Sequence, residues 1–170
     1  MKVIRKSDDV RLIDHINSFV VETGRIAIWW LGQSGFCIKQ GDLTIYLDPY
    51  FSTFLETLTA DVPEIRHIRM MESPIDPNEV TCADYIICSH AHYDHLDPET
   101  VMPILAANPR AKLIMPVASV GFAQTAGISE DRILTVDAGE KRQFGGVKLT
   151  AFAEKHNDFD YVDGLSLIHI

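Results

Sequence analysis

A short segment, residues 89–97, carries the side chains most able to do chemistry: three imidazoles and one carboxylate, at His90, His92, Asp94 and His95. A borderline-soft divalent ion such as zinc binds neutral imidazoles and carboxylates, and each ligand imidazole needs a second partner that orients it. A helix would turn His90 and His92 away from each other, because only residues three or four apart share a helix face. The spacing therefore predicts a metal site built in a tight loop.

The residues on either side of this segment predict the elements that hold it. Residues 85–88 form a short apolar run of the kind found in buried strands. Asp97 and Pro98 are typical of a helix cap and a first helical residue, and they predict a helix over residues 98–107. The segment would then lie at the carboxyl end of a strand, where open α/β sheets bind ligands. A surface loop of solvated histidines, or a metal that only braces the fold, is the alternative.

Strands precede the segment, and strands alternate with helices after it. Short β-rich runs at residues 26–31, 35–39 and 43–47 predict an antiparallel meander. A helix-like apolar stripe covers residues 8–21, with Ser7 as a cap, and residues 50–78 form a long connection of the kind that serves as a lid or substrate loop. Further elements are expected at residues 112–115, 117–126, 133–136 and 147–152. This alternation predicts an α/β fold with a mixed sheet faced by helices.

Composition limits the class of protein. The chain has 170 residues, 46% of them hydrophobic, which is enough to bury the core of one domain. The chain has no apolar run near the ~20 residues that span a bilayer and no secretory signal, so we expect a cytoplasmic protein without a membrane partner. A net charge of −9 without a basic cluster argues against nucleic acid as a partner and leaves a small-molecule substrate. Three cysteines without a C-x-x-C pair fit reduced thiols.

The segment at residues 90–95 resembles the His-x-His-x-Asp-His signature of the metallo-β-lactamase-fold hydrolases and matches it in full. Residues 29–36, residues 43–50 and the Asp-Pro pair after the histidines are similar to the branch that includes bacterial L-ascorbate-6-phosphate lactonase. The likeness runs from residue 25 to residue 164. It implies an αββα sandwich, of which this chain would supply the N-terminal half, with helices on the outer face of its sheet.

The resemblance also implies which residues would bind metal. His90, His92 and His156 would form one site, and Asp94 and His95 would begin a second, so two divalent ions are expected. Zinc, manganese and iron all suit such ligands. Two ions about 3.5–4 Å apart can hold a hydroxide that attacks the substrate, with Asp94 as the catalytic proton acceptor as well as a ligand. Without the resemblance, a lone loop histidine such as His156 is more often solvated.

Three candidate residues lie outside this motif. The resemblance implies that Asp48, at the end of an early strand, orients a ligand imidazole, although an Asp-Pro pair also marks turns. Arg66 and Arg69 lie in the long connection and could hold a substrate phosphate or carboxylate, because a guanidinium binds such groups through two parallel N–H bonds. Solvated loop charges are the commoner explanation of both arginines.

The end of the chain departs from the family pattern. The family completes its site with a bridging aspartate and a final histidine far downstream of His156, and the chain ends before them. Residues 165–170 resemble a translated non-native tail, so His169 is left out of the site and residues 1–164 are interpreted as one incomplete domain. Half of a sandwich would expose an apolar face, which favours association into a homo-oligomer.

Three functions are consistent with these features. The first is a metal-dependent hydrolase, similar to a lactonase, in which a metal-bound hydroxide attacks the carbonyl of a lactone or ester in a small, phosphorylated or unphosphorylated, sugar-derived substrate. The second keeps the fold and hydrolyses a phosphodiester. The third is a truncated domain that binds metal weakly and is catalytically inert.

Overall fold

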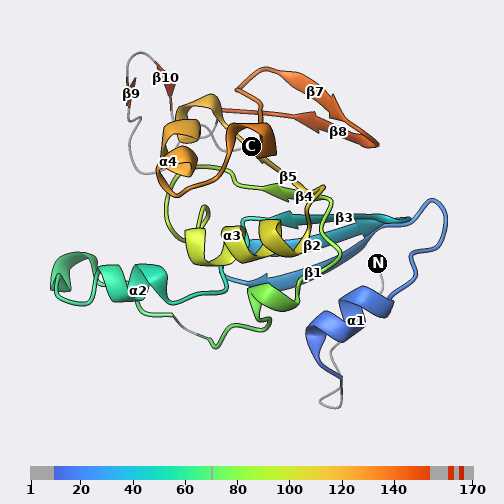
Figure 1. Ribbon diagram of the computed structural model, residues 1–170, viewed down its shortest axis with the longest axis horizontal. Coiled ribbons are helices and arrows are strands. Elements are labelled where there is room, and N and C mark those ends of the chain that lie inside the picture. The colour runs from blue at the N-terminus through green and yellow to red at the C-terminus, as the bar shows by residue number, and fades with distance from the viewer. Residues whose placement is uncertain (1–9, 70, 154–160, 163–164, 167–170) are drawn as a thin grey trace.

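Three antiparallel strands begin the sheet of this computed structural model, which describes residues 10–69, 71–153, 161–162 and 165–166 (Figure 1). β1 (Ala27–Gly32) pairs with β2 (Gly35–Gln40), and β2 pairs with β3 (Leu43–Leu47). Gly41 has a φ of 57°, a backbone conformation that glycine adopts without strain, in the tight turn between β2 and β3. The predicted meander is confirmed.

Parallel strands continue the sheet beyond β3. β4 (Tyr85–Ile87), β5 (Lys112–Met115) and β6 (Ile133–Thr135) add to it in chain order, each parallel to its predecessor. α3 (Pro98–Ala107) connects β4 to β5, and β5 is followed by η3 (Val117–Ser119), α4 (Val120–Thr125) and η4 (Glu130–Arg132). The result is a six-stranded mixed sheet with helices, which confirms the predicted fold class.

The two faces of this sheet are covered differently. α1 (Leu12–Ser18) and α3 pack on one face, where Ile16, Ile86 and Ile104 belong to the larger buried cluster (Figure 1). The hairpin of β7 (Lys141–Phe144) and β8 (Val147–Thr150) packs on the other face, over Ile87 and Ile114. Successive side chains of a strand point to opposite faces, so Ile86 and Ile87 contribute to separate clusters.

The side chains of β1 on the second face of the sheet are largely exposed to solvent. Ile28 is 62% exposed and Trp30 59% exposed, whereas Trp29 between them packs against the larger cluster. Within the described residues β1 pairs only with β2 and is an edge strand. The expected exposed apolar surface therefore exists at this edge, and self-association through it stays a prediction.

Several elements differ from the sequence-based expectation. The long connection holds short helices, namely α2 (Phe54–Leu58), η1 (Pro63–Ile65) and η2 (Pro77–Glu79). α1 is shorter than predicted because its cap is Arg11 and Phe19 already has an extended backbone; Ser7 lies outside the described residues. β7 was not predicted, because it is polar and mostly exposed. Two further strands, β9 (Tyr161–Val162) and β10 (Leu165–Ser166), form a short pair.

Two expectations drawn from composition can be compared with the structure. No helix in the described ranges is both long and apolar enough to cross a membrane. Cys37, Cys82 and Cys88 are all free thiols, as expected. Burial raises the pKa of the Cys37 thiol to about 12 and raises the pKa of Cys88 well above its usual value. These two thiols therefore serve as core side chains rather than nucleophiles.

Candidate metal centre

The candidate site forms where the parallel neighbours β3 and β4 end. Leu47 is paired with Ile87 in the sheet, and the amide of Asp48 donates to the carbonyl of Ile87 at 2.8 Å. Asp48 has a φ of 43°, an uncommon left-handed conformation that Asp tolerates better than most residues. This turn directs the Asp48 carboxylate toward the residue that follows the next strand.

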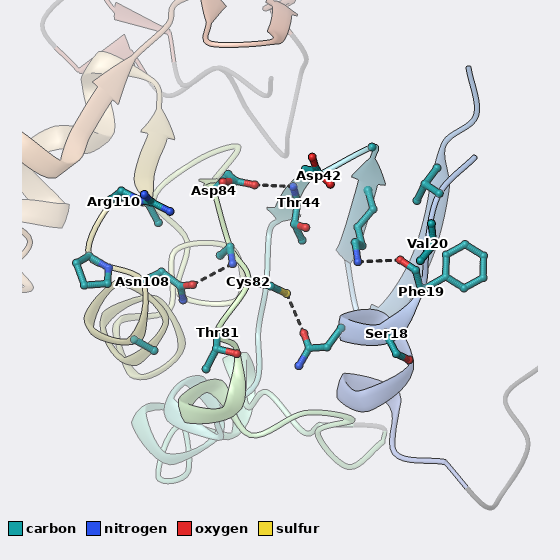
Figure 2. Close-up of a pocket in the computed structure, with 18 residues that line it drawn as sticks. Ser18, Phe19, Val20, Asp42, Thr44, Thr81, Cys82, Asp84, Asn108 and Arg110 are labelled. Carbon is teal, nitrogen blue, oxygen red and sulfur yellow. Dashed lines mark hydrogen bonds between the residues drawn. The ribbon is translucent and has the colours of Figure 1, made fainter. Parts of the chain in front are cut away.

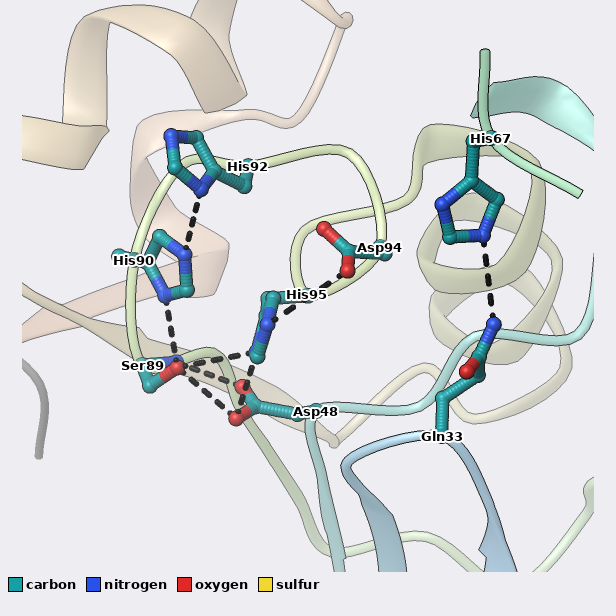
Figure 3. A network of polar contacts seen from close by, with 8 residues as sticks. All are labelled: Gln33, Asp48, His67, Ser89, His90, His92, Asp94 and His95. Carbon is teal, nitrogen blue, oxygen red and sulfur yellow. Dashed lines mark hydrogen bonds and ion pairs between the residues drawn. The ribbon is translucent and has the colours of Figure 1, made fainter. Parts of the chain in front are cut away.

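Asp48 is the centre of a buried polar network (Figure 3). Its Oδ1 accepts from the amide of Ser89 at 2.7 Å, and its Oδ2 accepts from the Ser89 hydroxyl at 2.8 Å and lies 3.0 Å from Nδ1 of His95. Burial alone would lower the pKa of His95, but the hydrogen bond and charge of Asp48, helped by Asp94, outweigh it and raise that pKa. Asp48 thus contacts the Nδ1 side of His95, where a carboxylate that orients a ligand imidazole would lie, and the role that the resemblance implied for Asp48 stays a prediction.

The first two histidines of the motif face each other. His90 is 2% exposed and His92 is exposed, and Nε2 of His90 lies 2.9 Å from Nδ1 of His92. A tetrahedral ion bound at about 2.1 Å would hold two such nitrogens about 3.4 Å apart, so a small separation of the rings accommodates it. The Ser89 hydroxyl lies 3.0 Å from Nδ1 of His90, which leaves Nε2 of His90 turned toward His92.

Asp94 and His95 lie beside this pair in the same tight turn. The amides of His95 and Leu96 both donate to the carbonyl of His92, at 2.9 and 2.7 Å, and fold the segment back on itself as the spacing predicted. The rings of His90 and His95 have centroids 4.1 Å apart, and Oδ2 of Asp94 lies 3.8 Å from Nε2 of His95. The four motif residues are therefore brought together.

The described part of the site is not a complete metal cage. Within residues 10–69 and 71–153, no group of three or more His, Cys, Asp or Glu side chains is arranged to hold an ion. His156, the expected third ligand beside His90 and His92, lies outside the described residues. The donor types, the close His90–His92 nitrogens and the Asp48-held His95 nevertheless fit a divalent ion, and the ligand roles stay predictions.

α3 anchors the far end of the motif. Asp97 is fully buried and caps the helix by accepting from the amide of Glu99 at 3.1 Å, as its sequence position predicted. It also accepts from the Thr100 hydroxyl, which accepts in turn from the amide of Phe51 at 2.7 Å. Burial raises the pKa of Asp97 against the opposing effect of these hydrogen bonds. This chain of bonds fixes the start of the long connection to the motif.

The two candidate arginines have different surroundings. Arg66 is exposed. Arg69 donates from Nη1 to the carbonyls of Tyr50 and Ser52, at 3.0 and 2.9 Å, and from Nε to the carbonyl of Met71 at 2.8 Å. Its guanidinium also lies over the Tyr50 ring, 4.8 Å from the centroid. Arg69 thus braces the long connection, and a substrate contact by either arginine stays a prediction.

The sequence indicated no role for Ser89 or Gln33. Ser89 joins Asp48, His90 and His95, and its position directly after a strand was the only available signal. Gln33 has a φ of 51°, and its side-chain nitrogen lies 3.3 Å from Nε2 of His67 (Figure 3). Its position between two glycines, in the turn that joins two strands, was the feature of the sequence that could have indicated a special backbone conformation.

A separate cavity of about 710 Å³ lies at the opposite ends of the strands (Figure 2). Lys39, Cys82, Asp84 and Arg110 are among its lining residues. The Lys39 ammonium donates to the carbonyls of Ile16 and Phe19, at 2.8 and 3.0 Å, and so caps the carboxyl end of α1. The cavity contains none of the motif histidines.

Residues 27–164 match the sequence profile of the beta-lactamase superfamily domain. The chain belongs to this superfamily. The match contains the motif at residues 90–95 and agrees with the resemblance that those residues indicated.

Curated relatives in the superfamily are distant. A UPF0173 metal-dependent hydrolase of Aeropyrum pernix is 28% identical over 122 residues, which cover 69% of this chain and 43% of the relative. An N-acyl-phosphatidylethanolamine-hydrolyzing phospholipase D of Caenorhabditis elegans is 27% identical over 131 residues, 75% of this chain and 35% of the relative. An uncharacterized protein of Mycobacterium tuberculosis is 24% identical over 140 residues, 82% of this chain and 36% of the relative. The chain thus spans less than half the length of these three relatives.

Solved structures share the fold. A metallo hydrolase from Ignicoccus hospitalis superposes with a TM-score of 0.52 at 15% identity, over 83% of this chain and 52% of that one. A diiron β-hydroxylase from Streptomyces venezuelae superposes with a TM-score of 0.56 at 13% identity, over 87% of this chain and 27% of that one. The metallo-β-lactamase fold is therefore shown, while the chemistry must be argued from the site.

Proposed function

We propose that this chain is the metal-binding segment of a metal-dependent hydrolase that opens a lactone or ester of a small sugar-derived substrate, phosphorylated or unphosphorylated. The observation that carries the proposal is the 2.9 Å approach of His90 Nε2 to His92 Nδ1, beside a His95 ring held by Asp48. The name of the Aeropyrum pernix relative supports metal-dependent hydrolysis. We propose two ions, zinc or manganese, because imidazole and carboxylate ligands suit both metals.

Each residue of the motif has a distinct role in this proposal. His90 and His92 would hold one ion, with His156 as the ligand implied by the resemblance, and Asp94 and His95 would hold the other. Divalent ions bound there supply Lewis acidity, which activates water and polarises the bond to be cleaved. Asp48 and Ser89 contact His95 on its Nδ1 side, which would orient the opposite Nε2 side of the ring toward an ion. Asp94, whose side chain is 30% exposed and whose Oδ2 lies 3.8 Å from Nε2 of His95, would accept the proton that the attacking water gives up.

A phosphodiester is the second candidate substrate. The phospholipase D name of the Caenorhabditis elegans relative favours it, because that relative covers the same motif at 27% identity. The same residues would serve both reactions, since a carbonyl and a phosphoryl group each need an activated water and a polarised oxygen. The choice between them depends on substrate contacts outside the motif.

The test measures metal content and activity together. The chain is purified with zinc or manganese, and bound metal is measured by mass spectrometry for the wild type, for His92→Ala and for His15→Gln, a histidine of α1 that contacts Trp29 instead of the motif. We expect metal in the wild type and His15→Gln and its loss in His92→Ala. Hydrolysis of lactones, compared with bis-p-nitrophenyl phosphate, then separates the two substrates. Equal metal content in all three proteins would refute the site, and bound metal without turnover of either substrate would leave only a metal-binding domain.

A further inference from the structure

The turn between β1 and β2 lies directly against the candidate site. Gly32 and Gly35 enclose it, and a Cβ atom on Gly35 would come within 3.1 Å of the Asp48 carbonyl oxygen. Gln33, between these glycines, has a φ of 51°, which costs free energy for a residue other than glycine. Backbone strain of this kind persists only where surrounding contacts hold it.

Separate contacts hold the backbone of Gln33 and its side-chain partner His67. The backbone carbonyl of Gln33 accepts from Nε1 of Trp30 at 2.9 Å, and the side-chain amide nitrogen of Gln33 lies 3.3 Å from Nε2 of His67. The backbone amide of His67 donates to the Thr59 hydroxyl at 2.9 Å, and the His67 ring packs edge-on against Tyr50, with centroids 5.9 Å apart. The pair therefore bridges the β1–β2 turn and the long connection.

This bridge favours one tautomer of the His67 ring. With the Gln33 amide nitrogen as the donor, Nε2 of His67 accepts, and the tautomer that fits this contact carries its proton on Nδ1. Figure 3 shows the Gln33–His67 pair on the side of the cluster where Asp94 lies, with the other nitrogen of the His67 ring turned toward that side. In this view, Nδ1 of His67 therefore faces the side of the cluster on which Asp94 lies.

Arg69 is a second candidate donor in this region, because its Nη2 atom is buried without a hydrogen-bond partner among the described residues, but its other donors are occupied. The carbonyl acceptors of its Nη1 and Nε atoms lie within the long connection itself. His67 shares that connection, and its ring is turned toward the motif. A neutral N–H donor binds an anionic oxygen more strongly than a neutral one, which points to phosphate or carboxylate as its acceptor.

We propose that His67 contacts the substrate of the hydrolase by donating its Nδ1–H to an oxyanion of that substrate, a phosphate or a carboxylate, and that Gln33 is the positioning residue that sets the tautomer. The inference rests on the proposed function for its substrate. Its test does not need turnover, because the tautomer and the binding of an oxyanion are measured directly.

The experiment is ¹⁵N NMR of the histidine side chains with inorganic phosphate as the probe. No metal is added, so that phosphate cannot be held by an ion. In the wild type we expect the Nδ1–H tautomer at His67 and a saturable shift of its Nδ1 signal, while His15 stays unchanged. Gln33→Leu should remove the tautomer preference, Gln33→Glu should reverse it, and both Gln33→Leu and His67→Asn should raise the phosphate dissociation constant at least fivefold.

Opposite results overturn the inference. A wild-type His67 with its proton on Nε2 contradicts the role of Gln33, and equal phosphate shifts at His15 and His67 indicate nonspecific binding. Unchanged phosphate affinity in both Gln33→Leu and His67→Asn refutes the substrate contact, and the unaltered His15 signals show that each variant is folded. Phosphate binding without hydrolysis, or hydrolysis without phosphate binding, separates the failure of the proposed function from the failure of this inference.

Discussion

Replacing Asp48 by Asn tests whether the buried carboxylate prepares the site for metal. Asn tolerates the left-handed backbone at this position, where φ is 43°, so the change affects the side chain rather than the turn. The Asn oxygen can still accept from the amide of Ser89, as Oδ1 of Asp48 does. The Asn nitrogen would take the place of Oδ2, which now accepts from Ser89 and binds Nδ1 of His95.

The expected effects follow from the replacement of Oδ2 by a nitrogen. An amide nitrogen donates, so Nδ1 of His95 must become the acceptor and its proton must move to Nε2, where it blocks a metal ligand. Loss of such an orienting partner weakens metal binding by about 10- to 100-fold, which is about 1.4–2.7 kcal/mol. One charge-assisted hydrogen bond is also lost from a residue that is 6% exposed, and this should lower the free energy of unfolding by about 2 kcal/mol.

Calorimetric zinc titration and urea denaturation measure the two effects separately. Asp42→Asn is the matched control, because Asp42 lies exposed in the turn before β3, away from the motif. We expect weaker zinc binding and lower stability in Asp48→Asn and neither effect in Asp42→Asn. If Asp48→Asn bound zinc as tightly as the control, the orienting role of Asp48 would be wrong, whatever its effect on stability.

Three further predictions concern the same region. His92→Asn should lose metal while the unfolding free energy of the metal-free chain changes little, because His92 is exposed; a metal content equal to that of the wild type, by mass spectrometry, would contradict its ligand role. Asp97→Ala should lower the unfolding free energy by about 2–4 kcal/mol, because it removes a buried cap and the partner of Thr100; a loss below about 0.5 kcal/mol in urea denaturation, the range of ordinary surface substitutions, would refute this. The raised pKa of His95 should stabilise the metal-free chain fully below the unfolded-state value of 6.5, and this contribution should be lost as pH rises through the raised value; denaturation at several pH values should show that loss in the wild type but not in Asp48→Asn.

The sequence predicted most of the sheet because its strands carry local signals. α3 was predicted over the observed residues 98–107, since Asp97 and Pro98 give both a cap and a first residue. α1 was predicted too long, because its apolar stripe continues into Phe19 although the backbone there is extended. β7 carries no apolar alternation and, among the described strands, pairs with β8 alone, so a pattern of buried side chains could not reveal it.

Only the part of the site that is local in sequence could be predicted. The motif residues are neighbours in sequence, and their residue types alone indicated metal chemistry. The bond between Asp48 and Ser89 joins residues that follow different strands, and only the resemblance suggested a role for Asp48. Contacts such as Gln33 with His67, which depend on how a turn and a long connection meet in space, have no local signal in the sequence.

The parallel pairing of β3 with β4 also bears on how the chain folds. β1, β2 and β3 are joined by tight turns, so their contacts are local and can form early, whereas β4 reaches β3 only after the whole long connection has been closed. Asp48 and Ser89 cannot meet before that slow step. Zinc binding at His95, followed during refolding, would therefore report when the long connection closes. We expect zinc to bind later than the first three strands form.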